Sequence, residues 1–180
     1  MRPDNTPNLV KDAQRDPAAF AMVYDRYLMP VYRYLYSRVG NAVDAEDLTT
    51  QTFLSALERL SGYRENGNFA GWLFAIAHSK VIDHYRREKP HAGSDVLWKI
   101  AGQDDPVLDV EKRLELEKLA SILQHLSADE QEIIRLRYAA DLSFSEMAVA
   151  LGKREDAVKK SLYRLLERLK QQAENQMETP

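Results

Sequence analysis

Residues 126–170 read LSADEQEIIRLRYAADLSFSEMAVALGKREDAVKKSLYRLLERLK, and this stretch decides the fold of the C-terminal half. Ser127 with Glu130, and Ser143 with Glu146, have the spacing of a capping box, in which serine and glutamate side chains satisfy free amide groups at a helix start. Each pair opens a run of apolar residues at helical spacing, and a glycine stops the second run. The stretch therefore predicts two short helices and a longer third one, which is the outline of a helix-turn-helix.

The helix expected after Gly152 is amphipathic and basic. Residues 153–170 hold 7 basic and 3 acidic side chains, although the whole chain has 25 and 28 and a formal net charge of −3. If Val158, Leu162 and Leu165 face inward, the outward face consists of Arg154, Glu155, Ala157, Lys160, Ser161 and Arg164. Such a face can reach base edges in a major groove while its cations contact phosphates. An ordinary surface helix with solvated charges shows the same pattern, so the rest of the sequence has to decide.

The N-terminal half also reads as helices, whose expected bounds are residues 16–40, 44–62 and 68–90. Asp16 and Pro17 suit the start of the first helix, and Pro30 is expected to kink or split it. Asp44 and Asp47 resemble a capping box for the second. Asn68 is expected to cap the third, whose inner face would consist of Phe69, Trp72, Leu73, Ile76, Ala77, Val81 and Ile82. Three helices of this size make one bundle.

Residues 90–106 lack helical periodicity and contain Gly, Pro and an acidic pair, which predicts a linker. An apolar trio interrupts it: Val96, Leu97 and Trp98. The trio either docks on a neighbouring domain or contacts a partner. We therefore expect an all-α chain of two small helical domains, 14–89 and 107–173, joined by this linker. The second should be a four-helix domain that contains the helix-turn-helix.

Composition excludes several classes of protein. The 180 residues are 44% hydrophobic, which is too apolar for a wholly disordered chain, and the absence of cysteine excludes disulfides and thiolate metal sites. The first 16 residues lack a signal peptide and no stretch approaches 18 uncharged apolar residues, so we expect a soluble cytoplasmic protein. The sequence contains no GxxxxGK[ST], HExxH or GxSxG motif and no defensible metal-ligand spacing of histidines. We expect no enzyme, no cofactor and no metal.

Aromatic and basic residues are interleaved around the third expected helix. The cations are Lys80, His84, Arg86, Arg87 and Lys89, and the rings are Tyr63, Phe69, Trp72 and Phe74. Single-stranded nucleic acid is bound in this way, with bases stacked on rings at about 1–3 kcal/mol each and phosphates beside cations. Phe69 and Trp72 fit the inner face and are expected to be structural. The freer candidates are Tyr63 and the polar loop residues Arg64, Asn66 and Asn68.

Two long stretches carry a family resemblance. FAMVYDRYLMPVYRYLYSRVGNAVDAEDLTTQTFLSAL, at 20–57, followed by FAGWLFAIAHSKVIDHYRRE, at 69–88, resembles region two of the extracytoplasmic-function (ECF) group of bacterial RNA polymerase sigma factors. Residues 126–170 resemble their region four, in the family's order and with a linker between. The resemblance implies a transcription initiation factor that docks on core RNA polymerase and directs it to promoters. It also implies an anti-sigma factor as a partner.

The resemblance also assigns roles to residues. Contacts with core polymerase would be made by Asp44, Asp47, Thr50 and Gln51. The −10 element would be melted and read by Tyr63, Arg64, Asn66, Asn68, Lys80, His84, Arg86 and Arg87. The −35 duplex would be read by Arg154, Glu155, Ala157, Lys160, Ser161 and Arg164. Helix capping is the structural alternative for Asp44 and Asp47. A stand-alone helix-turn-helix regulator and a helical adaptor for protein partners are the alternative functions.

Overall fold

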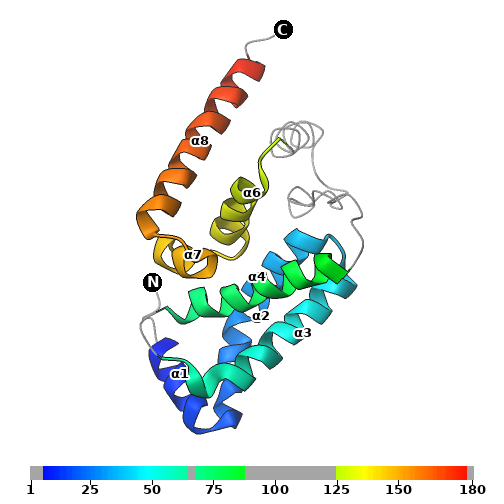
Figure 1. Ribbon diagram of the computed structural model, residues 1–180, viewed down its shortest axis with the longest axis vertical. Coiled ribbons are helices and arrows are strands. Elements are labelled where there is room, and N and C mark those ends of the chain that lie inside the picture. Colours follow the sequence, from blue (N-terminus) through cyan, green and yellow to red (C-terminus); the bar gives the residue numbers. More distant parts are fainter. Residues whose placement is uncertain (1–5, 65–67, 88–124, 178–180) are drawn as a thin grey trace, which may run out of the picture.

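The computed structural model describes residues 6–64, 68–87 and 125–177, and for residues 175–177 it describes only the backbone. Over these residues the chain forms helices joined by short turns, and no strand occurs among them, so the expected all-α class is confirmed. Figure 1 shows α1–α4 as one bundle and α6–α8 as a second group lying over it. Within the described part of the chain, no helix combines the length and apolar character needed to cross a membrane.

Several expectations fall outside the described residues. These are the linker with Val96, Leu97 and Trp98, the loop residue Asn66, and the first helix of the expected four-helix second domain.

The structure begins with a helix that the sequence analysis did not predict, α1 (Thr6–Arg15). Val10 and Ala13 form its buried side and pack in the same core as α2. Asp16 then caps a 3-10 turn, η1 (Pro17–Ala19), by accepting a hydrogen bond from the Ala18 amide at 2.9 Å. Asp16 and Pro17 thus act as a cap and first position, but of this 3-10 turn; the expected start of the long helix at these residues is wrong, because that helix begins at Phe20.

The long helix α2 (Phe20–Val39) continues through Pro30, so of the two expected effects of this proline, a kink or a split, the split is wrong. A proline inside a helix costs about 3 kcal/mol, because it removes one backbone hydrogen bond and crowds the preceding turn. Val31, Tyr34 and Leu35 follow directly and are fully buried. Their burial offsets that cost and keeps the helix continuous.

The next helix, α3 (Ala42–Arg59), is capped by Asn41, whose side chain accepts a hydrogen bond from the Asp44 amide at 2.8 Å. The expected capping box of Asp44 and Asp47 is therefore wrong. Asn41 adopts the extended cap conformation, and its own side-chain amide donates to Asp44 Oδ2 at 2.6 Å. A 3-10 turn, η2 (Leu60–Gly62), follows α3.

The last helix of the bundle, α4 (Phe69–Arg87), has most of its expected inner face. Phe69, Leu73, Ile76, Ala77 and Val81 are buried, and Trp72 is half-buried. Ile82 is 49% exposed, so its assignment to the core was wrong. It follows Val81 by one residue, about 100° further around the helix, and so leaves the buried stripe.

The second group consists of α6 (Ala128–Ile134), a π-helical turn η4 (Arg135–Ala139), α7 (Phe144–Leu151) and α8 (Glu155–Met177). Both capping boxes are confirmed, with each serine and its glutamate bonded reciprocally to backbone and side chain. Gly152 adopts the left-handed conformation, φ 61°, that ends α7. The helix-turn-helix is thus built as the sequence predicts.

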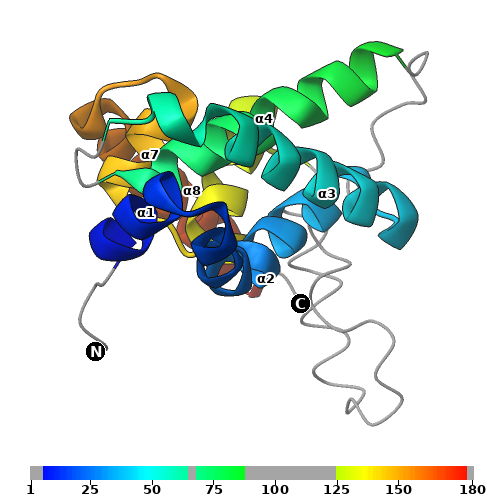
Figure 2. The ribbon, with the colours of Figure 1, turned by 90° about the horizontal axis from the view of Figure 1, so that it is seen from below.

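The two groups pack directly on each other. Residues of both belong to one hydrophobic core, and α7 lies along α4 (Figures 1 and 2). The two helices approach closely at Gly71, where a Cβ atom would lie 2.7 Å from the Glu146 carbonyl oxygen and 2.8 Å from the Val149 Cβ. Only a residue without a side chain fits there.

Candidate functional site

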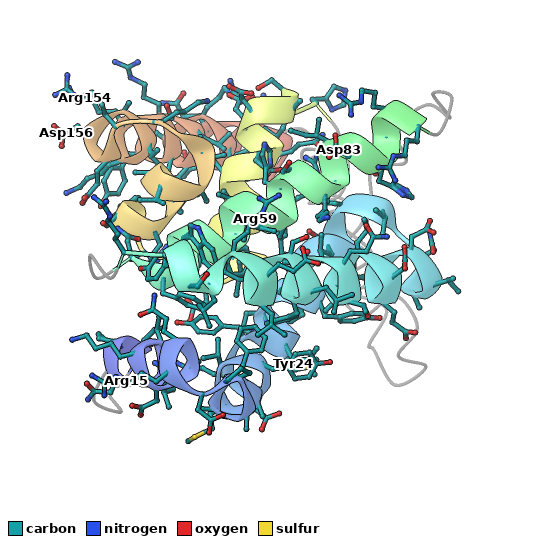
Figure 3. All side chains as sticks on the ribbon, turned by 60° about the horizontal axis from the view of Figure 1, so that its bottom comes forward. Arg15, Tyr24, Arg59, Asp83, Arg154 and Asp156 are labelled. Atoms are coloured by element: carbon teal, nitrogen blue, oxygen red, sulfur yellow. The ribbon has the colours of Figure 1, made fainter. Side chains whose placement is uncertain are left out.

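The outward face of α8 is open to solvent as the sequence predicts. Its six candidate residues are all exposed: Arg154, Glu155, Ala157, Lys160, Ser161 and Arg164. The opposite face, with Val158, Leu162 and Leu165, is at most 2% exposed. Figure 3 shows Arg154 and Asp156 projecting from the start of α8, far from Asp83 on α4. This face offers cations for phosphates and small residues, Ala157 and Ser161, that permit close approach to a duplex.

Ion pairs fix the orientation of α8. Arg168 of α8 contacts Glu130 at 2.7 Å, and Lys153, in the turn before α8, contacts Asp129 at 2.8 Å. Burial acts to raise the pKa of Glu130, but hydrogen bonds from Ser127 and Arg168 lower it overall. The same carboxylate therefore caps α6 and anchors α8. These two ion pairs connect α8 and the turn before it to the start of α6, in addition to the apolar packing of α8.

A polar groove runs between α3 and α4. It is lined by Asp47, Leu48, Gln51, Lys80, Asp83, His84 and Arg87. The groove brings together two candidates for polymerase contact, Asp47 and Gln51, with candidate cations for −10 DNA. The family resemblance assigned these residues to two different partners, core polymerase and −10 DNA, and did not include Asp83, which pairs with Arg86 at 2.9 Å. Carboxylates and cations alternate here, so the groove suits a partner that carries both charges, or two partners side by side.

The remaining α3 candidates make local contacts. Gln51 donates a hydrogen bond to Asp47 Oδ2 at 2.6 Å, and the Thr50 hydroxyl donates to the Glu46 carbonyl at 3.0 Å. Asp44 lies 3.8 Å from His84 and accepts from the capping Asn41. Asp47 and Thr50 are exposed, whereas Asp44 and Gln51 are partly covered. The first two are thus the more accessible to a partner.

The loop that joins α3 to α4 begins at a packed tyrosine. The Tyr63 ring lies 4.9 Å from the Trp72 ring and 5.4 Å from the Phe69 ring, between centroids, and is half-buried. Arg64, the next residue, is exposed. At the far end of the loop, the Asn68 side-chain amide donates a hydrogen bond to the Ser145 hydroxyl of α7 at 2.8 Å. Of the described loop candidates, Arg64 is the most open to solvent.

Sequence reasoning missed a contact between α1 and this loop. The side-chain amide of Gln14 donates hydrogen bonds to the carbonyl oxygens of Leu60, at 2.9 Å, and Tyr63, at 2.7 Å. These carbonyls stand at the two ends of η2. The helix that the sequence analysis did not predict therefore holds the entry to the candidate base-reading loop.

Sequence reasoning also missed a buried charge cluster that joins the two groups of helices. Glu132 of α6 accepts hydrogen bonds from Tyr34, at 2.6 Å, and Arg38, at 2.6 Å, and lies 3.0 Å from the His78 Nδ1 atom. Burial alone would raise the pKa of Glu132. The hydrogen bond with His78, the charge of Arg38 and the hydrogen bond from Tyr34 instead lower it to about 2. The carboxylate is therefore ionised at neutral pH although its side chain is 6% exposed.

A second buried charge, Arg135, lies one turn further along the same face. Its Nε donates to the Ser37 carbonyl at 3.2 Å, and its Nη2 donates to the Gln131 side chain at 3.0 Å. Burial and the neighbouring charge of Arg38 lower its pKa to about 10. The α6–α8 group thus meets α2 through specific polar contacts as well as apolar packing.

Two family models match the chain in order. Sigma-70 region 2 matches residues 23–91, and sigma-70 region 4 matches residues 116–169. The chain is 30% identical over 151 residues to the ECF RNA polymerase sigma factor SigD of Mycobacterium tuberculosis, covering 78% of this chain and 70% of SigD. It is 36% identical over 166 residues to the ECF RNA polymerase sigma factor BldN of Streptomyces coelicolor, covering 89% of this chain. The chain spans 63% of the length of BldN.

Solved structures share the fold. One is CnrH in complex with the cytosolic domain of CnrY, with a TM-score of 0.66 and 23% identity, covering 96% of this chain and 99% of that chain. Another is the sigma factor RpoE in complex with the anti-sigma factor NepR from Bartonella quintana, with a TM-score of 0.59 and 22% identity. It covers 84% of this chain and 94% of that chain.

Proposed function

The chain belongs to the ECF RNA polymerase sigma factors, and from this we propose that it is a promoter-selecting subunit of bacterial RNA polymerase. It docks on the core enzyme, and its first bundle melts and reads the −10 element. The exposed face of α8 reads the −35 duplex. The polymerase carries out the chemistry, so the chain needs no catalytic residue of its own.

The exposed face of α8 is the observation that carries this proposal. The face combines Lys160 and Arg164 with the small residues Ala157 and Ser161, and nothing among the described residues covers it. Ion pairs to α6 and apolar packing behind it hold the helix in place. In a helix-turn-helix such a second helix enters the major groove, while cations beside it contact phosphates.

The chain by itself is expected to bind DNA weakly. Its net charge is −3, and Glu155 and Asp156 place two carboxylates at the start of the reading helix. Non-specific affinity for DNA depends on neutralising phosphates, which an acidic protein does poorly. Two weak sites that the polymerase holds at a fixed separation act together and multiply their effective affinity. Selectivity should therefore emerge only in the holoenzyme.

Holding both elements at once requires the two groups of helices to separate. The −10 and −35 elements lie about 25 base pairs apart, or about 85 Å of B-DNA at 3.4 Å per pair. In the structure Asn68, at the end of the −10 loop, is hydrogen-bonded to Ser145 of α7, and one short turn joins α7 to α8. Helices of the two groups pack on each other at the usual spacing of about 8–10 Å between axes, so the packed arrangement is too compact to span about 85 Å of duplex. The packed arrangement is then a closed state that opens on the polymerase.

An anti-sigma factor completes the proposal. RpoE was solved in complex with the anti-sigma factor NepR, and it shares the fold of this chain. We expect a comparable protein partner here, acting in the cytoplasm where the polymerase works. A partner that keeps α6–α8 on the bundle would block initiation without touching the α8 face.

The reading face is tested by replacing Lys160 and Arg164 together with Ala. Transcription from −35-dependent promoters by reconstituted holoenzyme should fall at least about tenfold, since each lost base or phosphate contact costs about 1–3 kcal/mol. Lys170→Ala removes an exposed cation further along the same helix and serves as the control, with little expected change. Full activity of the double variant on these promoters would contradict the assignment.

A gel-shift experiment with promoter DNA separates this function from the alternatives. A sigma factor should shift the DNA only when core polymerase is present. Binding without core would favour a stand-alone helix-turn-helix regulator. Absence of binding under both conditions would favour a helical adaptor for protein partners.

A further inference from the structure

Gln14 fixes the backbone at the entry to the −10 loop from a helix outside the α3–α4 pair. Its side-chain nitrogen donates to the carbonyl oxygens of Leu60 and Tyr63, at 2.9 and 2.7 Å. An amide NH₂ group has two hydrogens, so both are used. The Leu60 carbonyl also accepts from the Tyr63 amide at 3.1 Å. Gln14 therefore ties together the two ends of the turn that closes α3.

Tyr63 is held on two sides. Its ring packs on Phe69 and Trp72 of α4, while its carbonyl is held by Gln14 of α1. The ring contacts fix where the side chain lies, and the carbonyl contact fixes the orientation of the peptide plane that leads to Arg64. Arg64 is exposed and follows this peptide directly, so the orientation of the Tyr63 carbonyl determines where the Arg64 side chain starts.

Resting on the proposed function, we infer that Gln14 is a positioning residue for recognition of the −10 element. Its side chain extends from α1 to the turn η2, behind the loop, and acts through the Tyr63 carbonyl. Reading a base requires the reading groups to be held within about 0.5 Å of the productive position by their supporting contacts. If Tyr63 and Arg64 lose this support, they can still contact an unpaired strand but discriminate less between bases.

Four substitutions separate positioning from a general structural role. Gln14→Glu keeps the shape but points an acceptor at two carbonyl oxygens. Gln14→Met keeps the length and removes the donors without adding charge. Gln14→Lys restores a donor group that can reach both oxygens. The control is Lys11→Gln, an exposed position on the same helix that changes the net charge by the same amount as Gln14→Glu.

The probe is a pool of promoter fragments with a duplex −35 element and unpaired, randomised −10 positions. Each full-length variant is assembled with core polymerase, and bound DNA is sequenced. Gln14→Glu should lower the preference for the favoured −10 bases about tenfold, the effect of losing one to two hydrogen bonds, and Gln14→Met should lower it less. Gln14→Lys and Lys11→Gln should keep the wild-type preference. The −35 preference and core affinity should stay unchanged in all four.

Unchanged −10 preference in both Gln14→Glu and Gln14→Met overturns the inference, whatever their thermal midpoints. An equal loss of −10 preference, −35 preference and core binding would also overturn it, because that result would show a purely structural role for Gln14. If Gln14→Glu fails to fold, the comparison of Gln14→Met with Gln14→Lys gives the same decision. Absence of any −10 preference in the wild-type holoenzyme would instead overturn the proposed function itself.

Discussion

At the scale of single residues, Glu132 decides how firmly the two groups of helices are held together. Its carboxylate is buried and accepts hydrogen bonds from Tyr34 and Arg38 of the bundle. Removing one partner of a buried charge pair is costly, because the other charge stays buried without compensation. Here that charge is Arg38, which lies one turn beyond Tyr34 on α2 and has a side chain that is 16% exposed. The cluster is therefore specific: it stabilises one way of packing α6 on α2.

We expect Glu132→Gln to shift the chain toward the open arrangement by about 3 kcal/mol, or on the order of a hundredfold. The open fraction can be measured at neutral pH by single-molecule energy transfer between dyes on cysteines introduced at Ser61 and Gln171. Both positions are exposed, and the chain has no other cysteine. Asp129→Asn makes the same charge change on an exposed residue of the same helix and should leave the open fraction nearly unchanged. Equal open fractions in the two variants would contradict this role.

The same carboxylate predicts a pH dependence. Its pKa is about 2 in the packed state and near its ordinary value of 4.5 when α6 is separated and solvated. Above pH 4.5 the group is ionised in both states and contributes about 3 kcal/mol to packing, and this contribution is lost as pH falls from 4.5 toward 2. Energy transfer in the labelled wild type should therefore decrease across this range. The Glu132→Gln variant should not show this decrease in energy transfer. Identical pH profiles of the wild type and the variant would rule out Glu132 as the source of the decrease.

At the scale of elements, the contact between α4 and α7 depends on Gly71. A Cβ atom there would lie 2.7 Å from the Glu146 carbonyl oxygen and 2.8 Å from Val149, closer than such atoms can approach. Gly71→Ala should therefore force α7 away from α4, while alanine favours the α4 helix itself by about 1 kcal/mol. We expect a larger open fraction in the energy-transfer assay with unchanged helix content by circular dichroism. Gly62→Ala, where a Cβ meets nothing within 4 Å, is the matched control.

The elements that the sequence predicted are those whose signals are local. Both capping boxes and the stop at Gly152 depend on residues within one turn, and they were found correctly. Asn41 and Asp44 show the limit of such signals, because both have capping chemistry and only the backbone conformation selects Asn41. At the candidate sites, the outward face of α8 could be predicted because it depends on the period of one helix.

What the sequence did not predict depends on contacts between distant segments. Glu132 and Arg135 look like solvated charges on a surface helix, and they become buried only because α2, almost a hundred residues earlier, packs on them. Gln14 lies in a helix with few apolar residues, and its partners are 46 and 49 residues away. The groove between α3 and α4 likewise requires two helices to be placed side by side. Periodicity along one segment carries no information on such pairs.

At the scale of the whole molecule, the proposed function makes opposite demands on the interface between the bundle and α6–α8. Packing of α6–α8 on the bundle buries apolar surface and the Glu132 cluster, which stabilises the chain in the absence of polymerase. Under the proposed function, promoter binding would place the two groups about 85 Å apart along DNA, so this packing would have to be given up. The free energy of closing is therefore subtracted from the free energy of forming the holoenzyme. A variant whose closed state is more stable should therefore initiate transcription less efficiently.

This relation can be tested by locking the closed state. Asn68→Cys with Ser145→Cys places two thiols where the native side chains are hydrogen-bonded at 2.8 Å, in a chain that has no other cysteine. A short reagent that forms disulfides with both thiols should reduce promoter-directed transcription by more than about tenfold, since the bridged groups cannot span the two elements. Reductant should restore the activity of the same preparation, which controls for the loss of the Asn68 side chain. Ser145→Cys alone, treated identically, should not respond, and a bridged factor that initiates as well as its reduced form would show that closure does not limit initiation.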